Sequence, residues 1–187
     1  MKRASRIVAV VVVIAACVGL GAYLAMNHPP PTPPAPKPQV KAPEKPVRKI
    51  KVYQVAVESN EPKLRPTEQD VEAGKNPAED ALRALIEQGD QGGLANPIPK
   101  DTRLLGFKVK KGLATVDLSR EFRDNFSGGS EAEGLTIGAI LRTLAQFPEI
   151  KRVLFLVEGK PLDTLGHLDL SGPQDVRWAG RQFGGDN

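Results

Sequence analysis

The segment FSGGSEAEG, residues 126–134, has the residue types and spacing of a catalytic or phosphate-binding turn. A hydrolase nucleophile needs glycines two positions before and two positions after its serine, so that a strained turn exposes the hydroxyl. Around Ser130 the first position is Gly128, but the second is Ala132. The base would have to be His167, far along the chain. A hydrolase built on Ser130, His167 and an acid is therefore an alternative, which is excluded if Ser130 and His167 lie well beyond hydrogen-bond reach.

The same segment is a poor phosphate cradle and a good helix start. A phosphate-binding loop needs Lys followed by Ser or Thr where its helix begins, whereas Glu131 and Glu133 would repel an anion here. Ser130 with Glu133 three residues later is instead a capping box. In it the hydroxyl accepts from the Glu133 amide, and the carboxylate accepts from the Ser130 amide. Gly128 and Gly129 give the chain room to turn, so we predict a structural motif.

Clustered acids and histidine raise two further chemistries. Acids close in sequence could form a glycosidase pair, but acids beside strand ends and helix starts are usually solvated or capping. Asp163, His167 and Asp169 make a weak metal set, and the single cysteine excludes a thiolate metal site. The sequence therefore predicts no catalytic residue, no cofactor and no metal. The clustered acids are Asp117, Glu121, Asp124, Glu131 and Glu133.

The charge distribution argues against a nucleic-acid partner. The chain has 26 basic and 22 acidic residues. Six of the basic residues and one of the acidic residues lie in residues 1–47, so the rest of the chain has 20 basic and 21 acidic residues. This remainder is nearly neutral, its basic side chains are scattered along the sequence, and few aromatic residues are interleaved with them. A phosphate-binding surface needs clustered cations. We therefore expect no nucleic-acid binding.

Residues 1–28 form the expected membrane anchor. The run Ile7–Met26 contains twenty residues without a charge, and at about 1.5 Å per helical residue it spans roughly 30 Å, the thickness of the bilayer's hydrocarbon core. Three basic residues, Lys2, Arg3 and Arg6, precede this run. The positive-inside rule then places the N-terminus in the cytoplasm and the rest of the chain outside. We expect a single-pass signal anchor in the cell membrane.

Two rival interpretations use the same N-terminal residues. A cleaved secretory signal ends its apolar region after about 7 to 15 residues, and the run here is longer. The stronger rival is lipoprotein processing, since Ile14–Cys17 resembles a bacterial lipobox with Cys17 as the acylated residue. Either mature form is tethered to a membrane.

Residues 29–47 form the expected linker. Nine prolines occur in the eighteen residues from Pro29 to Pro46. Proline fixes φ and lacks an amide donor, which predicts an extended polyproline II spacer without a core. At about 3.1 Å per residue the spacer can hold a domain roughly 55 Å from the membrane.

Residues 48–173 predict one compact α+β domain, with a mainly antiparallel sheet and two main helices packed on it. Apolar residues alternate over 49–58, which predicts a strand, and twice more over 104–118, which predicts a hairpin. Asn76 and Pro77 are typical of a helix start, and Gly89 is expected to end that helix.

The second half of the domain follows the same rules. Ser119 is expected to cap a short helical turn, and the main helix that begins at Ser130 is expected to end at Pro148. The next strand, Val153–Val157, is apolar on both faces. Gly159 turns the chain toward a short edge strand at Leu162–Leu165. Residues 174–187 are expected to be a flexible tail, in which Trp178 is either a packing lid or an exposed contact.

The order of these segments resembles the GerMN family of sporulation and spore germination domains. GLANPIPKDTRLLGFKVKKGLATVDLSREF resembles the family's proline-pair loop, hairpin and Val-Asp-Leu-Ser exit, although the family commonly has an acid or Asn in place of Lys111. FSGGSEAEGLTIGAILRTLAQFPEIKRVLFLVEGK resembles its Gly-Gly-Ser helix start, its Phe-Pro helix end and its Glu-Gly-Lys strand end. The resemblance runs from about Lys51 to Pro173. It rests on these segments in this order and spacing, and the predicted structural-motif residues are Gly128, Gly129, Ser130, Glu133, Pro148 and Gly159.

The resemblance implies a non-enzymatic, membrane-tethered, extracytoplasmic domain that interacts with envelope proteins and resembles ring-building modules, which adds a homo-oligomer as an expectation. A module that binds cell-wall glycan or another small envelope ligand is the alternative. It predicts a groove lined by polar and aromatic groups, and aromatic residues are 5% of this chain.

Overall fold

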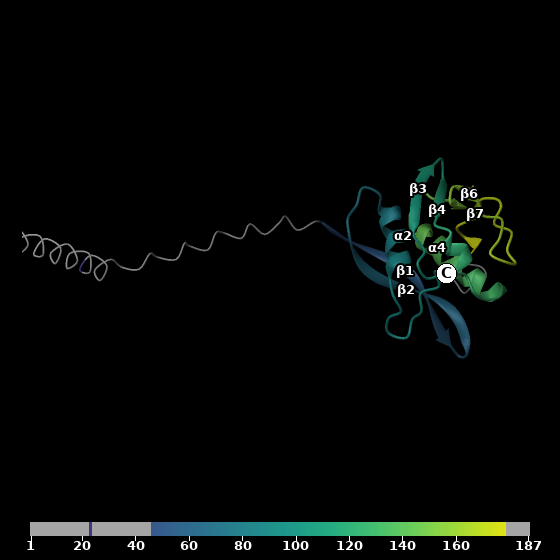
Figure 1. Ribbon diagram of the computed structural model, residues 1–187, viewed down its shortest axis with the longest axis horizontal. Helices are drawn as coiled ribbons and strands as arrows, with labels where there is room; N and C mark the ends of the chain where they lie inside the picture. The colour runs from purple at the N-terminus through teal and green to yellow at the C-terminus, as the bar shows by residue number, and fades with distance from the viewer. Residues whose placement is uncertain (1–22, 24–45, 179–187) are drawn as a thin grey trace, which may run out of the picture. The chain divides into compact units, whose positions relative to one another are not determined.

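The computed structural model describes Tyr23 and residues 46–178 (Figure 1). The expected anchor at residues 7–26, Cys17 and the linker up to residue 45 lie outside the described part, Tyr23 apart. Within the part described, no helix is both long enough and apolar enough to cross a bilayer. Residues 45–187 form one compact unit.

The domain is built in the order β1 Val47–Glu58, β2 Glu61–Glu72, α2 Pro77–Glu87, β3 Leu104–Lys110, β4 Leu113–Leu118, α3 Glu121–Asp124, α4 Ser130–Ala145, β5 Arg152–Val157, β6 Lys160–Pro161 and β7 Gln174–Asp175. This is the expected α+β class, with its strands divided between two sheets. One is the antiparallel ribbon β1–β2, and the other is a five-stranded sheet.

Strand β2 was not predicted, and its prolines explain why. Pro62 and Pro66 stand in a polar stretch, which is typical of a loop. Their partners across the ribbon are Val57 and Tyr53. The Tyr53 amide donates to a side chain of α4, away from β2. Because amides in an antiparallel pair alternate in direction, residues opposite such positions also direct their amides outward. Proline there removes no ladder bond and protects the free edge.

Helix α4 covers the other edge of the ribbon. The Gln146 side chain accepts from the Lys51 amide and donates to the Lys51 carbonyl. Thr143 Oγ1 accepts from the Tyr53 amide at 3.3 Å. Further along, Val55 exchanges two backbone hydrogen bonds with Ala95, in the loop after α2. The ribbon is thereby fixed to both the main helix and that loop.

The five-stranded sheet has the order β3-β4-β5-β6, with β7 paired to β5. The predicted β3–β4 hairpin is confirmed, and its turn is Lys111–Gly112, both with positive φ. Strands β4 and β5 are parallel, so a crossover must join them. Helices α3 and α4 supply it. The remaining pairs are antiparallel, as expected for a mainly antiparallel sheet.

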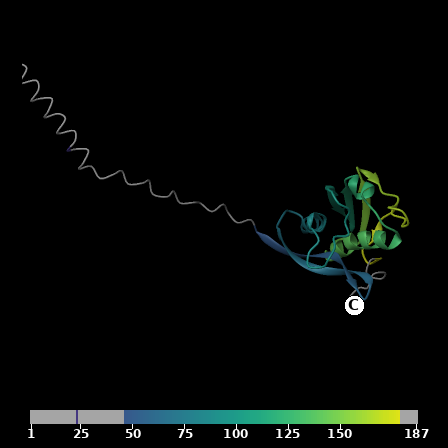
Figure 2. The ribbon, with the colours of Figure 1, turned by 60° about the horizontal axis from the view of Figure 1, so that its bottom comes forward.

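Helix α4 is the centre of the core. It is buried on nearly all sides from Glu133 to Thr143, because the ribbon lies against it on one side and the sheet packs with it on the other (Figure 2). Ile140 and Phe155 are fully buried in this shared core. The buried apolar residues of the described part run from Ile50 to Val176, so residues 45–187 contain the whole of this core and form an independent folding unit.

Of the three predicted helix caps, those at Asn76 and Ser130 have different outcomes. Asn76 caps α2 as predicted, because its Oδ1 accepts from the amides of Ala78 and Glu79 and Pro77 follows it. The capping box at α4 is wrong. The N-cap is Gly129, which makes no side-chain cap bond, and Glu133 is fully buried and directed elsewhere. A glycine in extended conformation can start a helix without a side-chain cap.

The predicted cap at Ser119 is also wrong. Arg120 is the N-cap of α3, and the Ser119 hydroxyl accepts from the Arg103 amide instead. The predicted edge strand at Leu162–Leu165 is displaced, since residues 162–165 are not in a strand and the strand that returns along β5 is β6, Lys160–Pro161. The expected tail begins later than residue 174, since β7 pairs with β5, Val176 is buried and Trp178 packs against the core.

Candidate functional site

A cleft of about 620 Å³ lies between the loop after α2 and the start of α4. Its walls come from two segments far apart in the sequence that both carry the family resemblance. Half-buried Phe126 and exposed Ser127 line one wall, and exposed Lys100 and Asp101 line the other. The remaining lining residues are Val55, Ala95, Asn96, Pro97, Ile98, Pro99, Asn125, Ala132, Leu135 and Thr136.

Asn96 fixes the loop that forms the first wall. Its side-chain amide donates to three carbonyls at the end of α2, with the shortest distance, 2.7 Å, to Gln88. Its Oδ1 accepts from the Ile98 amide at 3.0 Å. One side chain therefore ends helix α2 and sets the course of the proline-rich loop. Sequence reasoning missed this role, although an Asn before Pro is a known turn signal.

Two latches join the cleft walls. Thr136 Oγ1 lies 2.9 Å from the Pro97 carbonyl and equally far from the Ala132 carbonyl of its own helix, so its one proton is shared between the two. The Asn125 side-chain amide donates to the Lys100 carbonyl at 2.8 Å. Both bonds connect the loop to the α3–α4 region, so the cleft is preformed. Its floor includes Ile98 and Leu135, both buried. A floor of this kind with a polar rim suits binding of a ligand or a partner segment.

Glu133 does not face solvent but holds a distant loop. Its carboxylate accepts from the amide of Leu165 at 2.9 Å and from that of His167 at 2.7 Å. The Thr164 hydroxyl lies 3.4 Å from Oε1. The His167 ring is exposed, with Nδ1 3.5 Å from Glu133 Oε2. Within the described residues no hydrogen bond joins Ser130 to His167; the imidazole lies beside Glu133 instead.

The backbone conformation and the close neighbour of Gly128 explain why this position is glycine. Its φ is +143°, and an added Cβ would lie 2.5 Å from the Cβ of Ala132. Gly129 has no such neighbour. Gly159 has φ +75° in the β5–β6 turn, where its amide donates to Asp117 at 2.9 Å. The chain leaves α4 through Gln146, and Pro148 follows.

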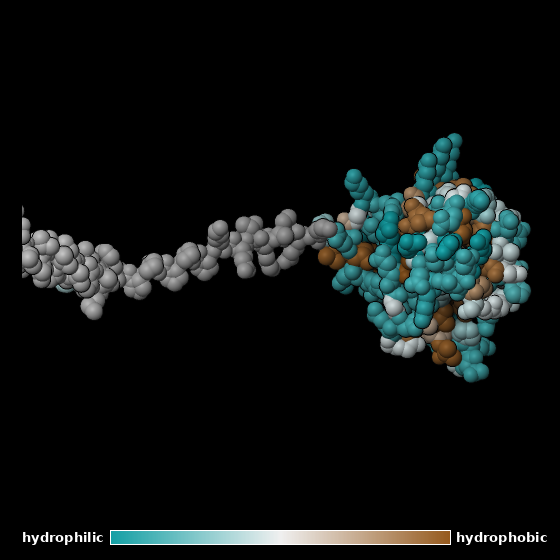
Figure 3. Space-filling model, viewed as in Figure 1, coloured by the Kyte–Doolittle hydropathy of each residue, from teal (hydrophilic) through white to brown (hydrophobic). Residues whose placement is uncertain are grey.

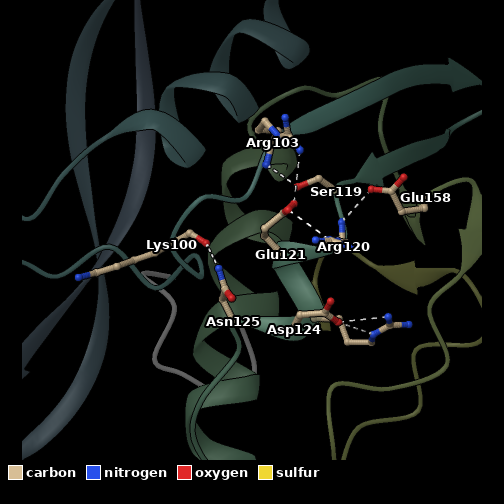
Figure 4. Close-up of polar contacts among 9 residues, drawn as sticks. Lys100, Arg103, Ser119, Arg120, Glu121, Asp124, Asn125 and Glu158 are labelled. Atoms are coloured by element: carbon tan, nitrogen blue, oxygen red, sulfur yellow. Dashed lines mark hydrogen bonds and ion pairs between the residues drawn. The ribbon is translucent and has the colours of Figure 1, made fainter.

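Glu121, another of the predicted acids, lies among paired charges at the end of the sheet where β4 and β5 finish (Figure 4). Glu121 lies 3.7 Å from Arg103 and 3.5 Å from Arg120. The Ser119 hydroxyl and the backbone amide of Glu121, followed by Arg103 and Arg120, hold the pKa of the Glu121 carboxyl below its ordinary value. Glu158 accepts from the Arg120 amide at 3.0 Å.

Asp124 and Asp169 are engaged by neighbouring residues. Asp124 pairs with Arg123 at 3.2 Å, and Asp169 accepts from the hydroxyl and amide of Ser171. These two Ser171 bonds hold the pKa of Asp169 below its ordinary value. Across Tyr23 and residues 46–178, no three His, Cys, Asp or Glu side chains gather closely enough to hold a metal ion. Glu131 is exposed on the first turn of α4.

Comparison with known families places residues 48–163 on the family model named Germane, described as sporulation and spore germination. The matched span contains both cleft walls. Comparison with curated proteins finds no match.

Solved structures with a similar fold include three relatives. A predicted lipoprotein of Clostridium perfringens is 29% identical, with a TM-score of 0.50, over 69% of this chain and 87% of its own. The tandem GerMN domains of the Bacillus subtilis sporulation protein GerM give 20% identity and a TM-score of 0.58 over 75% of this chain and 48% of theirs. The first of those domains alone is 23% identical, with a TM-score of 0.50, over 67% of this chain and 97% of its own. The last two show the fold alone.

Proposed function

Since the chain belongs to the Germane family of sporulation and spore germination domains, we propose that it is a membrane-anchored, extracytoplasmic interaction module of the bacterial cell envelope. The anchor is the uncharged run Ile7–Met26 or, alternatively, a lipid on Cys17. The similarity to a predicted lipoprotein supports an anchored form. The working surface is the cleft, and its partner is an envelope protein or a second copy of the chain.

The observation that carries the proposal is the preformed cleft. Its two walls are held together by side-chain bonds from Thr136 and Asn125. A surface fixed before binding loses little conformational entropy when a partner docks. A volume of about 620 Å³ accommodates one or two side chains of a protein partner or a small ligand.

We propose that this module works without catalysis. A serine nucleophile needs a base within hydrogen-bond reach. Within the described residues no hydrogen bond joins Ser130 to His167, and the carboxylate beside that imidazole, Glu133, already accepts from the amides of Leu165 and His167. Ser130→Ala and His167→Ala are therefore expected to leave partner binding in cells unchanged.

A second candidate is binding of cell-wall glycan or another small envelope ligand. The favouring observation is the composition of one cleft wall, where half-buried Phe126 stands beside the polar side chains of Asn125 and Ser127. Sugars bind proteins through polar groups combined with an apolar or aromatic surface. Retention of the domain on purified cell wall, without any crosslinked protein, would favour this candidate.

Crosslinking in intact cells tests the proposal. A photo-reactive amino acid replaces Phe126 in the full chain, and the same substitution at Leu105, an exposed apolar residue of β3 outside the cleft, serves as the matched control. We expect one discrete product from position 126 and none of that mass from position 105. Ser127→Arg, which fills the cleft, should remove the product. An unchanged product would reject the cleft as the interaction site.

The anchoring part is tested separately by the mass of the mature N-terminus. A mass that includes Met1–Met26 supports the signal anchor, and a diacylated Cys17 supports the lipoprotein form. Protease added outside intact cells should degrade the domain in both cases. A domain that is protected until the membrane is opened would contradict the extracytoplasmic assignment.

A further inference from the structure

Five cations gather at the end of the sheet where β4 and β5 begin. Each is solvent-exposed. We call this surface the basic end and define it as Lys108, Lys110, Lys111, Lys151 and Arg152. Lys108, Lys110 and Lys111 lie within four residues, but forty residues separate them from the other two cations, so the linear charge pattern shows only part of the cluster.

Sheet pairing brings the two halves together. Lys110 is opposite Leu113 in the hairpin, and Leu113 is opposite Arg152 in the parallel pair. The Gly112 carbonyl accepts from the amides of both Lys151 and Arg152, at 2.8 and 3.0 Å. The hairpin turn and the start of β5 are therefore immediate neighbours. Figure 3 shows hydrophilic side chains that project from the tip of this hairpin.

The structure offsets only part of the charge of the basic end, since Asp175 lies opposite Arg152 in the β5–β7 pair and the exposed Glu149 precedes Lys151 by two residues. In the part of the chain that the structure describes, none of its five side chains forms an ion pair. The nearby Arg177 is different, because it pairs with Asp175 at 2.8 Å. Like charges held together repel one another, and binding of an extended anionic surface removes that repulsion.

We propose that the basic end docks onto a bilayer that carries anionic phospholipids. Clusters of four to eight Lys and Arg bind such membranes through the summed attraction of their charges. Lysine suits this role, since its flexible stem places a hydrated point charge at the surface without demanding fixed geometry. Part of the basic end is the projecting tip of a hairpin. A projecting tip can reach a broad, flat surface, whereas a bound peptide needs a groove.

Two features separate this proposal from a specific anion pocket and from nucleic acid. The hollow beside Arg152 holds the Asp175 carboxylate, which would repel a buried phosphate. The five cations have no aromatic residue among them, whereas single-stranded nucleic acid is bound by cations together with stacking platforms. A lipid headgroup layer requires only charge.

The inference deepens the proposed function, since the anchor would keep the domain close to a bilayer and raise its effective concentration there. It does not depend on the identity of a protein partner. Docking would place the cleft at a fixed orientation to the membrane plane, because cleft and basic end belong to one folded unit.

Co-sedimentation with vesicles tests the proposal on residues 45–187, the compact unit that contains the buried core of the described residues. One set of vesicles contains phosphatidylcholine alone. The other contains phosphatidylcholine with about 30% phosphatidylglycerol, which makes its surface anionic. We expect binding to the anionic vesicles only, with loss of binding at high salt. Free phosphate at the same ionic strength should not compete more than chloride does. Selective competition would indicate a phosphate pocket and overturn the proposal.

A charge-matched pair of variants locates the surface. Lys110→Glu with Lys151→Glu changes the basic end, and Arg123→Glu with Lys160→Glu makes the same change in net charge at the opposite end of the sheet. Each Lys or Arg at a membrane surface accounts for about a fivefold change in partition, so the first pair should weaken binding at least about 30-fold. The second pair should bind within a few-fold of the wild type. Equal losses from both pairs would overturn the assignment.

Outcomes for the two proposals are distinguishable. If residues 45–187 ignore anionic vesicles while the full chain still yields the Phe126 crosslink, the basic end is not a lipid surface and the proposed function stands. If vesicle binding occurs but the mature protein lies in the cytoplasm, the anchoring proposal fails by itself. Binding to RNA but to neither vesicle type would reject the lipid proposal in favour of nucleic acid.

Discussion

The two ends of the five-stranded sheet carry similar numbers of cations and use them differently. Where β4 and β5 finish, Arg103 and Arg120 surround Glu121, and Arg123 pairs with Asp124. Where the same strands begin, the five side chains of the basic end form no ion pair within the described residues. The paired end uses charge to hold turns in place. No ion pair of the described fold uses the cations of the unpaired end, so we infer a partner outside the domain for them.

The largest expected effect lies near the paired end, at the buried Glu133. Glu133→Ala should lower the free energy of unfolding by about 2 to 4 kcal/mol, because two loop amides lose a charged acceptor in a buried site. Urea unfolding of residues 45–187 measures it. Glu131→Ala removes an exposed acid from the same helical turn and should change stability by less than about 0.5 kcal/mol. Similar effects from both variants would show that Glu133 has no special structural role.

The next effect tests the turn that leads into the same helix. Gly128→Ser should cost about 1 to 3 kcal/mol, since its φ is +143° and an added Cβ meets Ala132 at 2.5 Å. Gly129→Ser is the matched control. Gly129 is the N-cap, with extended φ and ψ, so a serine there should be neutral or stabilise the helix by a few tenths of a kcal/mol. Thermal unfolding of both variants gives the comparison, which fails if Gly129→Ser is the more damaging change.

The helix caps and the hairpin show which features could be predicted from the sequence. The Asn76 cap and the β3–β4 hairpin were predictable, because a cap or a two-residue turn depends on residues within four positions of each other. The capping box at Ser130 and Glu133 had the correct spacing, but Glu133 found a stronger set of donors in the loop after residue 163. A contact over that sequence distance leaves no local signal.

Strand β2 and the basic end were not predicted from the sequence, for the same kind of reason. Pro62 and Pro66 argue against a central strand, and only the ribbon register shows that both occupy outward positions. The cations at positions 110 and 151 appear scattered until parallel pairing of β4 with β5 joins them. The cleft was foreseen only as two separate family-like segments, and the latch from Thr136 to Pro97 needed the tertiary structure.

A smaller effect should appear in the pH dependence of the paired end. The pKa of Glu121 lies below its ordinary value of 4.5, so the folded state binds this proton less readily than the unfolded chain. Its stabilisation is therefore complete above pH 4.5 and is lost as the pH falls through the folded pKa. Glu121→Gln should make stability less sensitive to acid over that window, as measured by urea unfolding at several pH values. Arg103→Gln should raise the Glu121 pKa in an NMR titration. An unshifted resonance would mean that the ion pair has little weight.

The smallest effects compare the two ends directly and have opposite signs. Lys110→Gln at the unpaired end should raise stability by a few tenths of a kcal/mol at low salt, because it relieves repulsion among exposed cations. Arg120→Gln at the paired end should lower it by a similar amount, because it removes a neighbour of Glu121. Both differences should shrink in 1 M salt, where the Debye length is about 3 Å. Equal signs at low salt would mean that the two ends do not differ in charge balance, which would remove the electrostatic basis for placing a membrane contact at the basic end.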